Sequence, residues 1–443
     1  MRTLIHDVTA ITLDERDSVL RGATIALQDA RIVAVGEVPD AFTPDEVIDG
    51  SGHVALPAFF NGHCHAAMTL ERGWAEDLPF DRWLNERIWV AESALEEEDV
   101  YWGAALACCE MIRAGMVGFA DHYFWMHQVG RAVEESGMKA HLAWCHFGPA
   151  PEQELGGVSF EETVSFVEQF KGVGDGRIRT AMGPHSPYMT PTGVLERFVS
   201  EAHRIGVGAH FHLSESEEQL WNSLDLCGAT PVAHVASLGL LDLPEASVVA
   251  HCNAVTDEDL YTLADKGAWV AHTPKTYQKL AMQMPPLARM LEHGVRVALG
   301  TDGPASNSDL NMLEVARLTG LYQKDALGDP EAMPRTQLLR LATQAPAEAM
   351  GFKASGVLEA GRAADLVLLD TRAPHWIPRH DLVAGTVYAA HPGDVAYVWC
   401  NGKLLYRRGE FLTMDVERIS WEAERRAFRM VGTPMRQVRR YPA

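Results

Sequence analysis

The stretch VALPAFFNGHCH, residues 54–65, joins a short apolar run to two histidines that stand two positions apart. Alternate residues of a strand project to the same face, so His63 and His65 can bind one divalent ion through their imidazole nitrogens. Later apolar runs are followed by side chains of the same kinds, which are His212 with Glu215, His251 and Asp302. A single histidine in a chain that holds 19 of them would be weak evidence. The order of these signals predicts a metal site assembled from successive strands.

Eight apolar, β-rich runs alternate with longer amphipathic stretches over this part of the chain. They read VALPAFF, MVGFAD, KAHLAW, IRTAMG, VGAHFHL, SVVAHC, AWVAHT and VRVALGTD. Eight buried strands separated by helical segments predict an α/β fold of the (β/α)8, or TIM barrel, type over residues 54–356. In such a barrel the active site lies at the carboxyl ends of the strands. The polar residues that close or follow these runs are Asp121, His185, His212, His251, His272 and Asp302.

The two ends of the chain differ in character from the barrel region. Residues 1–53 and 357–415 both contain short alternating runs that are broken by Gly, Asp and Asn turns. Neither end alone has enough strands for a stable sheet, so we expect both to combine into one small β-sandwich domain beside the barrel. Residues 416–443 include WEAERRAFRMV and are expected to form a closing helical extension.

Bulk properties exclude several classes of protein. A chain of 443 residues with 47% hydrophobic and 22% charged residues is typical of a globular protein with more than one domain. The net charge of −22 repels phosphate backbones and anionic lipids, so we expect neither nucleic-acid nor membrane partners. We find no signal-peptide pattern, and the seven cysteines lack paired spacing, as suits a reducing compartment. The sequence therefore predicts a cytoplasmic protein.

One metal ion is expected. His212 from the fifth run and Asp302 from the eighth would complete a mononuclear site with His63 and His65, with room for one water. Mixed nitrogen and oxygen ligands suit Zn²⁺, with Fe²⁺ and Mn²⁺ as alternatives. A binuclear site would normally need a bridging ligand at the end of the fourth run. Residues 181–185 read AMGPH there, without Lys or Glu.

The same constellation contains candidates for hydrolytic chemistry. A divalent ion lowers the pKa of a bound water from about 15.7 toward ~7. Hydrolysis also needs a group that moves protons, and we expect Glu215, three residues after His212, to do so. His251 is the candidate for orienting the water or stabilising developing charge. Asp302 is expected both to hold the metal and to accept a hydrogen bond from the water.

Long segments around these residues carry a family resemblance. They include NGHCHAAMTLERGWAEDLPFDRWLNERIWVAE, GPHSPY, HFHLSES, HCNAVTDEDL, GTDGPASNSDLNMLE and GVLEAGRAADLVLLD. The chain resembles the amidohydrolase superfamily over nearly its whole length, in the branch of heterocycle deaminases and chlorohydrolases, and most of all the S-adenosylhomocysteine/5′-methylthioadenosine deaminases. The resemblance implies the metal and proton-transfer roles given above. It also implies replacement of a ring amino group by oxygen with release of ammonia, and a homo-oligomer.

The resemblance supplies candidate substrate contacts as well. Glu92, in a W-x-x-E match, and His185, in a G-P-H-x-P-Y match, correspond to residues that face the nucleoside in that family. They are therefore candidate ribose or ring contacts, and each hydrogen bond to a charged group contributes ~1.5–3 kcal/mol. Trp83 and Trp89 are candidate walls around an aromatic substrate.

Two segments depart from the family pattern. The family usually has an S-R-G segment after the third strand, where residues 143–145 read AWC, and P-x-S-N-x-K-L-x-S-G after the seventh, where residues 274–283 read PKTYQKLAMQ. Trp144 in place of a cationic side chain removes a carboxylate partner and adds apolar stacking surface. Lys275 and Tyr277 are candidates for a different polar contact. The departures preserve the reaction class and leave the substrate open.

Three alternatives stand beside a deaminase of adenosine-type nucleosides. The first is an aminohydrolase or chlorohydrolase of another ring, such as guanine, a pterin or a substituted triazine. The second is a cyclic-amide hydrolase, whose relatives commonly use two metals bridged by a lysine carbamate, and the missing strand-four Lys counts against it. The third is a catalytically inactive assembly protein. Retention of all four ligands together with Glu215 and His251 counts against that reading.

Overall fold

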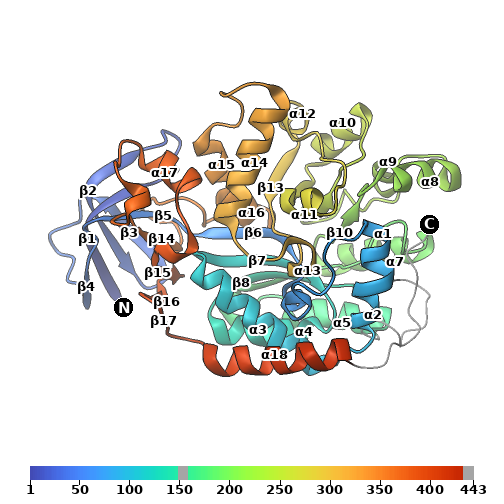
Figure 1. Cartoon of the computed structure of the whole chain (residues 1–443), viewed down its shortest axis with the longest axis horizontal. Helices are drawn as coiled ribbons and strands as arrows, with labels where there is room; N and C mark the ends of the chain where they lie inside the picture. Colours follow the sequence, from blue (N-terminus) through green and yellow to red (C-terminus); the bar gives the residue numbers. More distant parts are fainter. Residues whose placement is uncertain (148–157, 433–443) are drawn as a thin grey trace.

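Eight parallel strands form the barrel in the computed structural model, which describes residues 1–147 and 158–432 (Figure 1). One half contains β6 (Phe59–Cys64), β7 (Met116–Tyr123), β8 (Lys139–Trp144) and β9 (Ile178–Ala181). The other contains β10 (His210–Leu213), β11 (Val248–His251), β12 (Trp269–His272) and β13 (Arg296–Leu299). Met182 and Ala209 pair at one seam between the halves, and the Asp302 N–H donates to the His63 carbonyl at 2.9 Å at the other. The predicted (β/α)8 barrel is confirmed.

Helices follow the strands on the outside of the barrel (Figure 1). Their bounds are α1 (Phe80–Trp83), α2 (Trp89–Glu92), α3 (Glu97–Arg113), α4 (Met126–Ser136), α5 (Phe160–Phe170), α7 (Thr192–Ile205), α8 (Glu217–Cys227), α9 (Pro231–Ser237), α10 (Asp257–Lys266), α11 (Pro274–Lys279), α12 (Leu287–Glu292), α14 (Met312–Leu327), α15 (Arg335–Ala342), α16 (Gln344–Ala349) and α17 (Leu382–Tyr388). Capping residues fix where some of these helices begin. Ser159 with Glu162 forms a capping box at the start of α5, and Thr256 with Asp259 forms one at the start of α10.

Strands from both chain ends form one mixed sheet beside the barrel. Its members are β1 (Arg2–Ile11), β2 (Val19–Gln28), β3 (Arg31–Gly36), β4 (Glu46–Asp49), β5 (His53–Pro57), β14 (Leu366–Asp370), β15 (Val395–Cys400), β16 (Lys403–Arg407) and β17 (Glu410–Phe411). Ala55 and Leu368 face the sheet's own core, whereas Val54 and Val367 face the barrel core. The alternation of strand side chains therefore lets one sheet serve two cores. The small β domain expected from both ends is present, along one continuous hydrogen-bonded path.

The first predicted run, VALPAFF, is divided between two sheets. Its first half belongs to β5, which pairs with β14 in the mixed sheet, and the barrel strand begins at Phe59 rather than at Val54. Ala58 separates the strands, and its N–H donates to the Asp365 carbonyl at 3.1 Å. Both halves are fully buried, so the sequence reads as one apolar run and hides the break.

The predicted closing helix is α18 (Val416–Gly432), which runs along α3 (Figure 1). Arg426 and Arg429 of α18 both donate to Asp99 at the start of α3. Residues 433–443, the rest of the predicted extension, lie outside the described residues. Within the described ranges, no helix has both the length and the apolar character needed to cross a membrane.

Candidate active site

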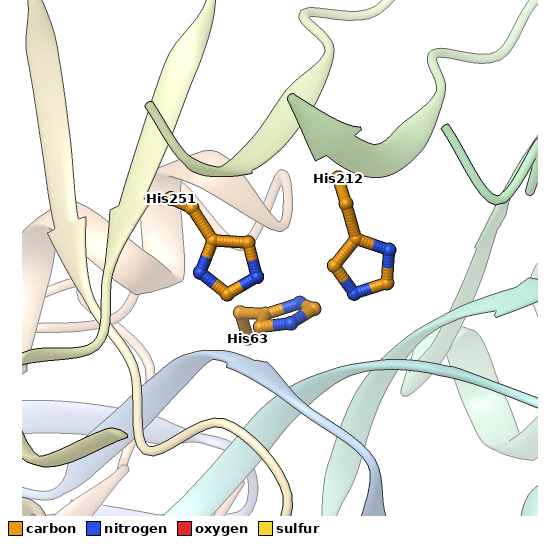
Figure 2. Close-up of side chains that lie close together, drawn as sticks. All are labelled: His63, His212 and His251. Atoms are coloured by element: carbon orange, nitrogen blue, oxygen red, sulfur yellow. The ribbon is translucent and has the colours of Figure 1, made fainter. Parts of the chain in front are cut away.

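The carboxyl ends of β6, β10 and β13 bring the four predicted metal ligands together. Asp302 Oδ1 lies 3.6 Å from His63 Nε2 and 3.3 Å from His65 Nε2. His212 Nε2 lies 3.3 Å from His65 Nε2. His251 stands beside them, and its ring faces those of His63 and His212 with potential ligand atoms within 4.8 Å of one another (Figure 2). Five groups thus surround one point.

Hydrogen bonds to backbone carbonyls determine which imidazole nitrogens face that point. Nδ1 of His65 donates to the His122 carbonyl at 2.6 Å, and Nδ1 of His212 donates to the His185 carbonyl at 3.0 Å. Because a carbonyl only accepts, each Nδ1 carries the proton and each Nε2 presents a lone pair. Lone pairs 3.3 Å apart repel unless a cation lies between them. Buried His63 Nε2 also lacks a hydrogen-bond partner among the described residues, so the donor set fits a divalent cation.

Unusual backbone conformations turn these side chains toward one another. Ser214, His251 and Asp302 have φ values of 51°, 82° and 67°, in the left-handed region that non-glycine residues rarely adopt. Each lies at or just after the carboxyl end of a barrel strand. Such strain is tolerated where the surrounding structure enforces it, which is common at functional sites.

Glu215 is held beside the ligands with one oxygen directed at them. Tyr188 Oη donates to Glu215 Oε2 at 2.8 Å, and the Glu215 backbone N–H donates to Gln219 Oε1 at 2.8 Å. Glu215 Oε1 lies 3.6 Å from His251 Nε2, and both side chains are buried. This carboxylate is therefore positioned to exchange protons with a molecule bound at the ligands.

His65, His212, His251, Asp302 and Glu215 form the floor of an open cavity, and His63 lies buried beneath it. Most of its wall is aromatic or aliphatic: Met68, Phe80, Trp83, Leu84, Trp89, Phe124, Phe147, Tyr188 and Leu280. No lysine or arginine among the described residues lines it. The cavity thus suits a flat, uncharged molecule.

A second carboxyl group lies on another wall of the cavity. Glu92, at the end of α2, is 4% exposed and accepts a hydrogen bond from Tyr123 Oη at 2.7 Å. Burial raises the pKa of Glu92 to about 8. Glu71 is buried as well, and desolvation, with the charge of Glu92, raises its pKa well above the usual range.

Of the predicted substrate contacts, Glu92, His185 and Trp83 line the cavity, and so does Trp89. Trp144 does not, because its ring lies 5.2 Å from the ring of His127 and 5.7 Å from that of Phe166. Adjacent residues of an extended chain point in opposite directions, and Cys145 lines the cavity instead. The structure thus places the Trp144 indole outside the cavity lining, and its contact with substrate stays a prediction.

Lys275 and Tyr277 also lie outside the cavity lining. Lys275 Nζ is bonded to Asp309 at 3.1 Å and to Glu314, so ion pairing turns it away. Tyr277 is fully buried, and its hydroxyl meets His251 rather than the cavity. In this structure both side chains are engaged by other protein groups, and a direct polar contact with substrate stays a prediction.

The other strand-end residues are divided in the same way. His185, His212, His251 and Asp302 line the cavity, whereas Asp121 and His272 do not. Asp121 accepts the Ala66 backbone N–H at 2.9 Å, and burial raises its pKa to about 7. Burial lowers the pKa of His272 to about 3.

Sequence reasoning missed Tyr123 and Tyr188, which donate to Glu92 and Glu215 in the cavity. Tyr123 follows Asp121 by two positions at the end of β7, and the GPHSPY motif contains Tyr188. Strand alternation and that motif were the available signals. Phe147, whose ring stacks on His185 at 4.5 Å, carried no such signal.

Comparison with known proteins identifies the family of this chain. The model of the amidohydrolase family matches residues 54–405. The 5-methylthioadenosine/S-adenosylhomocysteine deaminase of Pelotomaculum thermopropionicum is 42% identical over 432 residues, covering 97% of this chain and 99% of the relative. That of Moorella thermoacetica is 43% identical over 429 residues, covering 96% and 99%. The chain therefore belongs to the amidohydrolase family, which confirms the resemblance and the prediction of a hydrolase.

Solved structures with a similar fold agree with this family assignment. The crystal structure of an adenosine deaminase from Xanthomonas campestris with bound zinc has a TM-score of 0.91 and 29% identity, and covers 97% of this chain and 99% of that chain. An atrazine chlorohydrolase from Arthrobacter aurescens TC1 complexed with zinc has a TM-score of 0.88 at 24% identity, with 96% and 100% coverage. The latter likeness shows the shared fold.

Proposed function

We propose that this protein is a metal-dependent deaminase that replaces the ring amino group of an adenosine-type nucleoside by oxygen and releases ammonia. One observation carries the proposal: His65, His212 and Asp302, clustered with buried His63, line the floor of a cavity together with Glu215, and Glu92 lies on one of its largely aromatic walls. The names of relatives about 40% identical along nearly the whole chain support the same reaction.

Zinc is the ion that we propose for the site, as a single ion. Three imidazole nitrogens from His63, His65 and His212, with one carboxylate from Asp302, suit its preference for mixed nitrogen and oxygen ligands. A divalent ion bound there would act as a Lewis acid and make water nucleophilic near neutral pH. The zinc-bound structure of the Xanthomonas deaminase supports this choice.

The chain's own residues would move the protons. Glu215 Oε1 faces the ligands, where it accepts a proton from the attacking water and gives it to the ring nitrogen beside the reacting carbon. A second transfer, from the newly added hydroxyl to the amino group, lets nitrogen leave as ammonia while a carbonyl forms on the ring. Tyr188 holds the other oxygen of Glu215, so the carboxylate keeps one orientation in both transfers.

The residues of the cavity wall support a ranking of the candidate nucleoside substrates. Glu92 can accept hydrogen bonds from two ribose hydroxyls, and Trp83 and Trp89 can pack against an aromatic base. The cavity lining described above offers no cation for the carboxylate of a homocysteine tail. We therefore propose that 5′-methylthioadenosine and adenosine are better substrates than S-adenosylhomocysteine.

We also propose a cytoplasmic homo-oligomer that binds neither nucleic acid nor membranes. The net charge of −22 supports the latter part, since it repels polyanions. All seven cysteines lie in the described residues as free thiols, which suits a reducing compartment.

The test is ammonia release, followed together with ultraviolet spectra, by protein of measured metal content. The panel comprises 5′-methylthioadenosine, adenosine, S-adenosylhomocysteine, adenine, guanine, a pterin and an aminotriazine. We expect turnover of the first three, with kcat/KM at least about tenfold lower for S-adenosylhomocysteine, because a charged hydrogen bond is worth ~1.5–3 kcal/mol. Activity on another ring alone would reassign the substrate. Silence on every amine by fully metallated protein would contradict a deaminase.

A further inference from the structure

We propose that Tyr277 is a positioning residue that determines which ring nitrogen of His251 carries the proton. This inference rests on the proposed function, because the reacting end of the cavity is assigned there to the metal ligands and Glu215, and His251 lines the cavity beside them. Tyr277 lies on α11, is 0% exposed and does not line the cavity. Its Oη lies 3.3 Å from His251 Nδ1.

The direction of this hydrogen bond follows from the other partner of the hydroxyl. The Thr273 backbone N–H donates to Tyr277 Oη at 3.2 Å, so the phenol oxygen already acts as an acceptor. Burial raises the pKa of Tyr277 far above its usual range, which keeps the hydroxyl protonated. A buried O–H without an acceptor would be destabilising. The Thr273 hydroxyl lies near the same nitrogen, with its Oγ1 3.5 Å from His251 Nδ1. The Tyr277 hydroxyl is the nearer of the two at 3.3 Å, and we assign it as the donor to His251 Nδ1.

The consequence for His251 is the opposite of that for its neighbours. A neutral imidazole has one ring proton, so acceptance at Nδ1 places the proton on Nε2. Nε2 is the nitrogen that lies 3.6 Å from Glu215 Oε1. His65 and His212 instead donate from Nδ1 to carbonyls and present Nε2 lone pairs.

The two tautomers give the histidines of this cluster different roles: His65 and His212 can act as metal ligands, and His251 can act as a hydrogen-bond donor. His251 stands as close to the ligand positions as the ligands themselves (Figure 2). An N–H at Nε2 cannot ligate an ion, but it can donate a hydrogen bond to charge that develops on a bound molecule. Tyr277 thereby keeps His251 out of the coordination shell and available as a donor.

A double-mutant cycle tests the proposal by activity. Tyr277→Phe removes the hydroxyl and keeps the ring, and we expect kcat to fall about 10–100-fold, the range typical of residues that orient active-site histidines. KM should stay within about twofold, because Tyr277 does not line the cavity. In a His251→Ala background the same change should alter kcat by less than about twofold, since the residues act as one unit. An equal fall in both backgrounds, or no fall in the first, would overturn the proposal.

A matched control separates loss of a buried hydroxyl from loss of positioning. Tyr101 is also buried, and its hydroxyl donates to Glu135 at 2.6 Å, away from the cavity. Tyr101→Phe should lower the thermal midpoint about as much as Tyr277→Phe does and leave kcat unchanged. A comparable kcat loss in both variants would indicate a structural effect only.

A second readout does not depend on turnover. Nitrogen NMR of metal-loaded protein with ¹⁵N-labelled histidine should show His251 protonated at Nε2, its signals being those that disappear in His251→Ala. Tyr277→Phe should shift them toward a mixture of tautomers. Protonation at Nδ1 in the unaltered protein would refute the inference even if the enzyme were active. Protonation at Nε2 would support it even if no nucleoside were deaminated.

Discussion

The two ends of the barrel hold buried polar groups in opposite states. At the carboxyl end, the Nε2 lone pairs of His65 and His212 converge with the carboxylate of Asp302, whose Oδ1 accepts one backbone hydrogen bond, from the Gly303 N–H at 2.7 Å. At the amino end, Lys139 at the start of β8 donates to Asp365 and to Ser355, with side-chain exposures of 5% and 0% for the ion pair.

The difference distinguishes a ligand-binding site at the carboxyl end from a structural ion pair at the amino end. The converging lone pairs at the carboxyl end are stabilised when a ligand binds between them. At the amino end, Lys139 and Asp365 already neutralise each other, and this ion pair ties the barrel to the mixed sheet. Arg179 and Glu245, 3.3 Å apart, add a second ion pair at the amino end. Changes at the first end should therefore alter metal content and turnover, and changes at the second should alter stability.

The largest expected effect is the loss of a ligand. His63→Ala should lose metal affinity and lower kcat/KM by about 1000-fold or more, because the Lewis acid contributes several kcal/mol to the transition state. Metal analysis after gel filtration, together with ammonia release, checks both. His293→Ala, in a half-exposed histidine far from the cavity lining, is the control. Full metal content with near-normal turnover in the His63 variant would remove this residue from the site.

Substitution at Glu215 should separate binding from chemistry at the same end. Glu215→Gln preserves the shape and the contact with Tyr188 but removes the proton acceptor, so we expect full metal content and a loss of kcat of roughly 10²–10³-fold. KM should change much less. Glu217→Gln, an exposed change at the start of α8, provides the comparison. Unimpaired turnover would exclude Glu215 from proton transfer.

At the amino end the expected loss is one of stability. Lys139→Met leaves Asp365 buried without its cation, and breaking such a pair costs about 3–5 kcal/mol of unfolding free energy. Metal content and kcat should be retained below the lowered thermal midpoint. Lys403→Met, at an exposed position of β16, should have little effect. If Lys139→Met lost turnover without losing stability, the two ends would not be separable as described.

Glu71 should make stability depend on pH. Burial raises its folded-state pKa above the unfolded value, so its contribution to stability is present at low pH and is lost as pH rises through the folded-state pKa. Glu71→Gln stays neutral, and its thermal midpoint should therefore fall less than that of the unaltered protein between pH 5 and 8. Exposed Glu424→Gln is the matched control. Parallel pH profiles for the unaltered protein and Glu71→Gln would contradict this.

The sequence was sufficient for the barrel and the ligand cluster because both leave local marks. A buried run that ends in a histidine or an aspartate identifies a strand and its carboxyl end, as at His212 and Asp302. Side-chain direction has no such mark. Whether Trp144 or Cys145 faces the cavity depends on strand parity, and a shift of one residue exchanges the faces. The direction of Tyr277 likewise depends on how the short helix α11 packs, which the sequence does not reveal.

The smallest expected effects test whether Trp144 contacts the substrate. Trp83 lines the cavity and stacks on Phe80 with ring centroids 6.0 Å apart, whereas Trp144 packs against Phe166 outside the lining. Trp83→Leu should raise KM about 2–10-fold, since an aromatic contact contributes ~0.5–1.5 kcal/mol. Trp144→Leu should leave KM within about twofold and lower the thermal midpoint instead. If Trp144→Leu raised KM as much as Trp83→Leu does, the Trp144 indole would contact the substrate. Trp144 would then take the place of the cationic side chain of the family pattern by direct contact, rather than by leaving an uncharged wall.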